Sequence, residues 1–140
     1  MSTPVSAATA WLAAADPDPD HAARWLGSTT IVVLPTGRSF DAVKVPEHVG
    51  RRVQKAGVDG PVISDPAGQT MFFLVPPGTA SRWEPTGDAV CLGLNSYLTV
   101  PVPEVTAAPG PHWIQPPAEE GQLVDPALLA DLLRTVGEAS

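Results

Sequence analysis

Short apolar segments, separated by turns rich in proline and glycine, recur through the middle of this chain. Alternation of apolar and polar positions, together with β-branched and aromatic residues, predicts strands in these segments. The expected strands are residues 29–35, 40–45, 60–65, 69–78, 88–93, 96–101 and 110–117. The first is so apolar that we expect it to be buried. The third and fourth are expected to form one antiparallel hairpin, and the fifth and sixth another.

Helical periodicity is found at both ends of the chain and once between the second and third expected strands. The N-terminal helices fall within residues 5–26, where Trp25 is expected to face inward and Asp20 to cap the second helix. Residues 47–57 form the next expected helix. Pro46 suits the first turn of a helix, and the apolar positions that follow it recur on one side.

The last expected helix spans residues 125–137, where Asp125 caps the first turn. Its apolar stripe consists of Leu128, Leu129, Leu132 and Leu133. The order of elements predicts an α+β fold, with a mainly antiparallel sheet flanked by helices. With 140 residues the chain is expected to be a single domain, with its core over residues 29–117.

The chain contains no apolar run long enough to cross a bilayer, so we expect no contact with a membrane. Its N-terminus lacks a basic region followed by a sustained apolar stretch, which a secretory signal would have. We therefore expect the protein to be cytoplasmic.

Charge is distributed unevenly along the chain. The net charge of −7 argues against broad binding to nucleic acid, where Lys and Arg neutralise phosphates. Residues 38–55 nevertheless hold five cations against Asp41 and Glu47, so this segment carries +3 and the remainder −10. The five cations are Arg38, Lys44, Arg51, Arg52 and Lys55. They are either a solvated basic face or a contact surface for phosphate or an acidic partner.

Few residues that could bind a metal or act as a nucleophile have the sequence spacing of a known metal-binding or catalytic motif. The chain has three scattered histidines, no His-x-x-x-His or Cys-x-x-Cys pair and no phosphate-binding loop, so we expect no metal and no cofactor. Cys91 is the only cysteine, and we expect it to behave as a small buried hydrophobe. Asp41 and Lys44 lie three residues apart on one strand, so their side chains are expected on opposite faces. A possible pocket would combine Asp41, Cys91, His112 and Trp113.

Five segments, taken in order, resemble the N-terminal prim-pol domain of bifunctional DNA primase/polymerases, and among these the short actinobacterial members. They are LPTGRSFDAVKVP, GPVISDPAGQTMFFLVPPG, CLGLNSYLTVPV, GPHWIQPP and LVDPALLADLL, so the resemblance extends over residues 29–133. It implies a primase/polymerase-like, RRM-related core. In this family a strand carries a metal-binding Asp-x-Asp, the following hairpin carries a histidine, and a further acidic residue comes later.

The resemblance places other residue types at each of these positions. Lys44 and Pro46 stand where the family has Asp-x-Asp, Thr70 stands at the histidine, and Val90 stands near the later acid, with Asp88 two residues before it. An ammonium in place of a carboxylate repels a divalent ion, by about 4 kcal/mol per unit charge at ~4 Å and an effective dielectric constant of ~20. The resemblance therefore implies an ancestral polymerase scaffold without polymerase chemistry.

Three hypotheses for function follow. The first is a catalytically inactive primase/polymerase-like domain that acts as a binding or regulatory module for an unknown protein partner. The second is residual binding of a nucleotide or single-stranded nucleic acid through the five cations of residues 38–55. The third is an enzyme of unrelated chemistry on the old scaffold, in specialised metabolism, that uses His112, Cys91 or Asp41.

Overall fold

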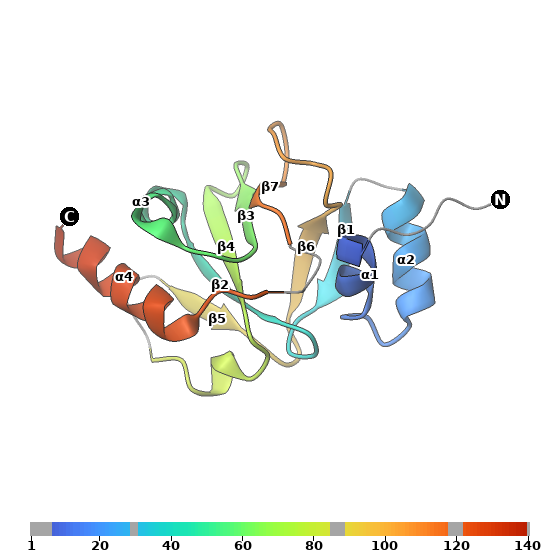
Figure 1. Ribbon diagram of the computed structural model, residues 1–140, viewed down its shortest axis with the longest axis horizontal. Helices are drawn as coiled ribbons and strands as arrows, with labels where there is room; N and C mark the ends of the chain where they lie inside the picture. The colour runs from blue at the N-terminus through green and yellow to red at the C-terminus, as the bar shows by residue number, and fades with distance from the viewer. Residues whose placement is uncertain (1–6, 29–30, 85–88, 118–121, 140) are drawn as a thin grey trace.

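The computed structural model describes residues 7–28, 31–84, 89–117 and 122–139 as a two-stranded and a five-stranded antiparallel sheet with four helices (Figure 1). The helices are α1 (Ala7–Ala13), α2 (Pro19–Ser28), α3 (Glu47–Gly57) and α4 (Pro126–Ala139), with a short 3-10 helix η1 at Thr79–Ser81. The strands are β1 (Ile31–Pro35), β2 (Asp41–Pro46), β3 (Val62–Asp65), β4 (Thr70–Val75), β5 (Val90–Leu92), β6 (Tyr97–Pro101) and β7 (His112–Gln115). The expected α+β fold with a mainly antiparallel sheet is confirmed. None of the described helices is both long and apolar enough to span a bilayer.

The five-stranded sheet has the order β5-β2-β4-β3-β7, and β1 pairs with β6 in a separate ribbon. The predicted hairpin of β3 and β4 is confirmed, with Asp65 paired to Thr70 at the turn. The second predicted hairpin is wrong, because β5 pairs with β2 whereas β6 pairs with β1. The turn between β5 and β6 contacts Thr36, whose N–H donates to Ser96 O at 2.9 Å and whose hydroxyl donates to Gly93 O at 2.5 Å. This turn therefore leads the chain from one sheet to the other.

Two apolar layers hold the sheet. On one face, Val43, Val45, Met71 and Phe73 pack with Val53 of α3 and with Leu129 and Leu133 of α4. On the other, Ala42, Ile63, Leu74 and Trp113 pack with Leu12 of α1 and with Val32 and Leu34 of the ribbon. Fully burying each of the large side chains contributes about 1.5–3 kcal/mol. Figure 1 shows the result, with α3 and α4 at one end of the molecule and the ribbon with α1 and α2 at the other.

The N-terminal end differs from expectation in three respects. Asp18, rather than Asp20, caps α2, because its carboxylate accepts the N–H of His21 at 3.2 Å. The side chain of Trp25 is 50% exposed, not inward. The first strand is buried on one side only, since Val33 is 58% exposed while Leu34 is fully buried.

The outer side of the β1–β6 ribbon is uncharged and largely apolar. Ile31, Val33 and Tyr97 are all exposed there, and neither strand contains a charged residue. In α4, Leu129 and Leu133 are buried as predicted, whereas Leu128 is 42% exposed because it lies on the side of the helix away from the sheet. Asp125 caps this helix as expected, by accepting the N–H of Ala127 at 3.0 Å.

Candidate functional site

Strand β2 separates its side chains between the two faces of the sheet. Asp41, Val43 and Val45 lie on the side of α3 and α4, and the two valines join the apolar layer there. Lys44 therefore lies on the opposite side, where it is exposed. The expectation that Asp41 and Lys44 occupy opposite faces is confirmed.

The four positions that the resemblance assigns to the metal site lie together on the side of Lys44. Lys44 and Val90 are directly paired across β2 and β5, and Pro46 and Thr70 are directly paired across β2 and β4. Cross-strand partners project to the same face with Cβ atoms about 5 Å apart, and residues two apart on one strand share a face. Asp88, the remaining acidic residue near this pattern, lies outside the described residues.

Phe72 completes this surface and Asp65 lies at its margin, and the sequence alone identified neither. Phe72 is paired with Lys44 on β4, and Asp65 is paired with Thr70 on β3. Counting residues back from the turn of the β3–β4 hairpin gives its register. That register would have placed Asp65 beside Thr70 and Phe72 on the same face as Thr70. We call the surface formed by Lys44, Pro46, Thr70, Phe72 and Val90 the open face.

The open face has the chemistry of a mixed apolar and cationic surface. Lys44 supplies an ammonium, Thr70 a hydroxyl, and the half-buried Phe72 and the 54% exposed Val90 supply apolar area. Asp65, at its margin, accepts the N–H of Gly68 at 3.4 Å within the turn. In the described part of the chain, no three His, Cys, Asp or Glu side chains group as a metal site would require.

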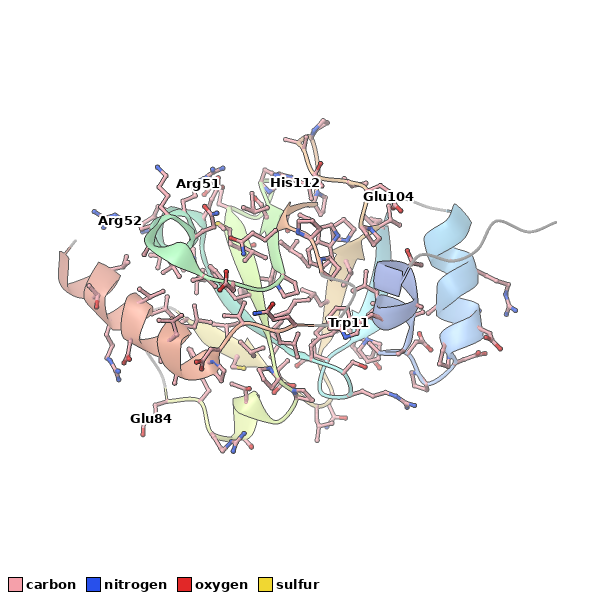
Figure 2. All side chains as sticks on the ribbon, in the orientation of Figure 1. Trp11, Arg51, Arg52, Glu84, Glu104 and His112 are labelled. Carbon is pink, nitrogen blue, oxygen red and sulfur yellow. The ribbon has the colours of Figure 1, made fainter. Side chains whose placement is uncertain are left out.

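The five cations of residues 38–55 are all exposed, but they are not gathered into one patch. Arg51, Arg52 and Lys55 project from α3, which covers the face of the sheet opposite Lys44 (Figure 2). Arg38 lies in the turn before β2, whereas α3 follows the other end of that strand. Arg51 is engaged by Glu47, whose carboxylate accepts from its Nη2 at 2.6 Å.

A hollow of about 450 Å³ adjoins the open face where α3 begins. It is lined by Pro46, Glu47, His48, Arg51 and Gln69. Only one of the five cations, Arg51, borders it, and the adjacent Glu47 offsets its charge. The hollow therefore has little net attraction for an anion.

Asp41 is a buried structural carboxylate. Its side chain is 1% exposed, and Oδ2 accepts the N–H of Ala80 at 2.8 Å, while Oδ1 has no hydrogen-bond partner within the described residues. Burial, and secondarily the charge of Asp41, raise the pKa of the Cys91 thiol to about 12. Because the thiolate is the reactive form, Cys91 is not an activated nucleophile at neutral pH.

The four residues of the possible pocket lie in two places. Asp41 and Cys91 lie on neighbouring strands β2 and β5, whereas His112 and Trp113 lie on β7 at the opposite edge of the sheet. At about 4.8 Å per strand, Asp41 on β2 lies about 14 Å from β7, and Cys91 on β5 lies one strand further, at about 19 Å. Trp113 is buried and donates its Nε1–H to Pro101 O at 2.8 Å, and His112 Nδ1 lies 2.9 Å from Gly110 O. Trp113 thus links β7 to the end of β6, and His112 contacts the loop that precedes its own strand.

No protein-family model, no curated protein and no solved structure matches this chain. What the open face can bind therefore follows from its own chemistry. It offers one ammonium and one hydroxyl beside an aromatic ring and a branched aliphatic side chain.

Proposed function

We propose that this chain is a primase/polymerase-like domain that has lost metal-dependent nucleotidyl transfer and acts as a binding or regulatory module through its open face. One observation supports the resemblance beyond the order of its motifs. Lys44 with Val90, and Pro46 with Thr70, are directly paired positions on one face of adjacent strands. Lys44 and Pro46 share a face by alternation alone, whereas Thr70 and Val90 come from other strands and could each have faced either side.

The residues of the open face do not fit a divalent metal. Two-metal phosphoryl transfer needs carboxylates that converge on ions a few ångströms apart. The open face instead carries an ammonium, an imino acid, a hydroxyl and an isopropyl group at the corresponding positions. Lys44 adds a positive charge where the ions would lie, so no step of nucleotidyl transfer is assigned to this chain.

The occupant best suited to the open face is a protein segment that presents an acidic group beside an apolar one. Lys44 would pair with the acidic group, and Phe72 and Val90 would cover the apolar one. Such mixed contacts, with a charge at the margin of an apolar patch, are typical of protein interfaces. Binding of a nucleotide or single-stranded nucleic acid would instead need several cations around one ligand, and those of residues 38–55 are spread over separate surfaces.

A primer-extension assay with the purified chain tests the loss of nucleotidyl transfer. We expect no templated incorporation with either Mg²⁺ or Mn²⁺, and incorporation by the chain would overturn the proposal. A fluorescence anisotropy titration with labelled single-stranded DNA, at about 50 and about 200 mM salt, tests the nucleic-acid alternative. The nucleic-acid alternative predicts tight binding that falls steeply with salt, is lost in Lys44→Glu and is kept in Arg52→Glu. That result would identify nucleic acid, rather than a protein, as the ligand of the open face.

A further inference from the structure

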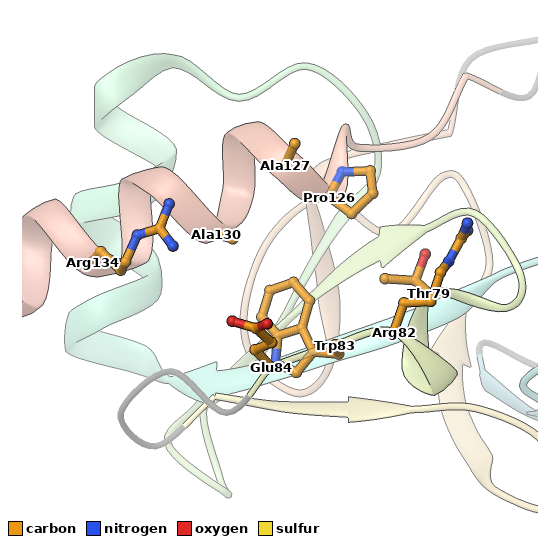
Figure 3. Close-up of a pocket in the computed structure, with 8 residues that line it drawn as sticks. All are labelled: Thr79, Arg82, Trp83, Glu84, Pro126, Ala127, Ala130 and Arg134. Atoms are coloured by element: carbon orange, nitrogen blue, oxygen red, sulfur yellow. The ribbon is translucent and has the colours of Figure 1, made fainter.

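A second hollow, of about 410 Å³, lies on the other side of the sheet, between α4 and the segment after η1 (Figure 3). Its lining includes Arg82, Trp83, Glu84, Ala127, Ala130 and Arg134. We call it the α4 hollow. Because α4 covers the face opposite Lys44, this hollow is separate from the open face, and its function does not depend on the proposed one.

Small side chains on α4 keep the hollow empty. Ala127, Ala130 and Arg134 follow a spacing of three and then four residues, so they form one stripe along the helix. Leu129 and Leu133, on the adjacent stripe, are buried against the sheet. A methyl group at positions 127 and 130 leaves room above the indole of Trp83, which a larger side chain would fill.

The opposite wall is held by hydrogen bonds before any ligand binds. Asp41 accepts the N–H of Ala80 at 2.8 Å, and this buried carboxylate has no other hydrogen bond to a described residue. The hydroxyls of Thr79 and Ser81 donate to Pro76 O at 2.6 Å and to Gly78 O at 2.8 Å. Arg82 and Trp83 thus follow a rigid turn. Because this wall is already ordered, ligand binding has a smaller loss of conformational entropy to offset.

The side chains around the hollow combine one flat ring with two guanidinium groups. In Figure 3 the indole of Trp83 points toward α4, with Arg134 at one end of the hollow and Arg82 at the other. Arg82 makes no side-chain hydrogen bond or ion pair to another described residue, and Arg134 pairs with the exposed Asp131. An exposed ion pair of this kind contributes about 0–1 kcal/mol, so a ligand can compete for Arg134.

We propose that the α4 hollow binds a small molecule made of a flat aromatic ring and one anionic group. The ring lies against Trp83, and the anionic group takes the bidentate hydrogen bonds that a guanidinium offers to carboxylate or phosphate. The hollow falls within the range of about 300–1,000 Å³ found for small-molecule sites. Glu84 borders the hollow and Asp131 pairs with Arg134, so the carboxylates offset much of the charge of the two arginines, which argues against a polyphosphate ligand. An aryl carboxylate, with one charge, and a nucleoside monophosphate, with about −1.5 to −2 at neutral pH, both combine a flat ring with one anionic group.

Isothermal titration calorimetry with 2-naphthoate, adenosine monophosphate and inorganic phosphate tests the proposal. We expect at least one aromatic anion to bind with Kd below about 1 mM, and the tighter of the two identifies the ligand class. Arg82→Gln should weaken that binding by about tenfold or more. Asp131→Asn should strengthen it by about two- to threefold, because it releases Arg134 from its exposed ion pair. Arg52→Gln, on the outer side of α3, is the matched control and should change nothing.

The outcomes are distinguishable. Absence of heat with both aromatic probes up to about 10 mM would overturn the site. Binding of inorganic phosphate as tight as that of the aromatic anions would also overturn it, because the ring would then contribute nothing. Binding that is unchanged in both Arg82→Gln and Asp131→Asn would place the ligand elsewhere. Circular dichroism of each variant separates loss of binding from loss of fold.

Discussion

Replacing Lys44 and Val90 by aspartate tests whether these two positions are neighbours on the open face. They are direct partners across β2 and β5, so their Cβ atoms lie about 5 Å apart. Two carboxylates at this separation can share a divalent ion. Both native side chains are largely exposed, so the double variant loses little packing.

The expected magnitudes follow from this separation. Without metal, two carboxylates about 5 Å apart repel by about 1 kcal/mol in water and about 3 kcal/mol at an effective dielectric constant of ~20. A divalent ion at about 100 times its Kd stabilises the folded state by about 2.7 kcal/mol. For a chain of this length we expect a rise in Tm of about 8 °C, at about 3 °C per kcal/mol.

Thermal unfolding monitored by circular dichroism, with and without Mn²⁺, measures the effect. We expect a rise only in the double variant, and no rise in the wild type or in Lys44→Asp and Val90→Asp alone. A double variant that responds no more than the single variants would refute the pairing of these positions. A rise in the wild type would refute the loss of the metal site.

Four other predictions concern the packed side of the sheet. With a pKa of about 12 against an ordinary value of 9.0, Cys91 should react with iodoacetamide at pH 8 about a thousandfold more slowly in the native than in the unfolded chain. For the same reason the contribution of Cys91 to the free energy of unfolding is constant below pH 9 and falls as the pH rises toward 12; a fall in urea stability over this range that is no larger in the wild type than in Cys91→Ala would contradict the shift. Gly50→Ala should destabilise the fold by about 1–3 kcal/mol in spite of a gain of about 1 kcal/mol in helix propensity. An added Cβ would lie 2.7 Å from Met71 Sδ, so a variant as stable as wild type would contradict this close packing. Asp41→Ala should cost about 1–3 kcal/mol and accelerate hydrogen exchange at the Ala80 amide, whereas unchanged exchange there would show that the carboxylate does not hold η1.

Local signals were sufficient to predict most helices and the hairpin of β3 and β4. The turn of that hairpin is encoded within a few residues, between Asp65 and Thr70. The partner of β5 could not be predicted in this way, because Val90 pairs with Lys44, 46 positions earlier in the chain. The turn after β5 is held by the hydrogen bond from the Thr36 hydroxyl to Gly93 O. This contact joins segments that are distant in the sequence, so no local pattern predicts it.

The candidate site was predicted in part. Strand alternation was enough to separate Asp41 from Lys44, and the resemblance identified four positions that the sheet register then places on one face. The depth of Asp41 was not predictable, since a carboxylate on a strand next to a tight turn is more often exposed. The distance between Cys91 and Trp113 could not be predicted either, because it depends on the three strands that lie between them in the sheet.

The uncharged outer side of the β1–β6 ribbon has a consequence for the behaviour of the protein in solution. At neutral pH the net charge of −7 keeps molecules apart by mutual repulsion. Near the sequence pI of about 4.7 the net charge falls to about zero and this repulsion is lost, while Ile31, Val33 and Tyr97 remain exposed. At that pH we expect the exposed apolar side chains of the ribbon to favour self-association.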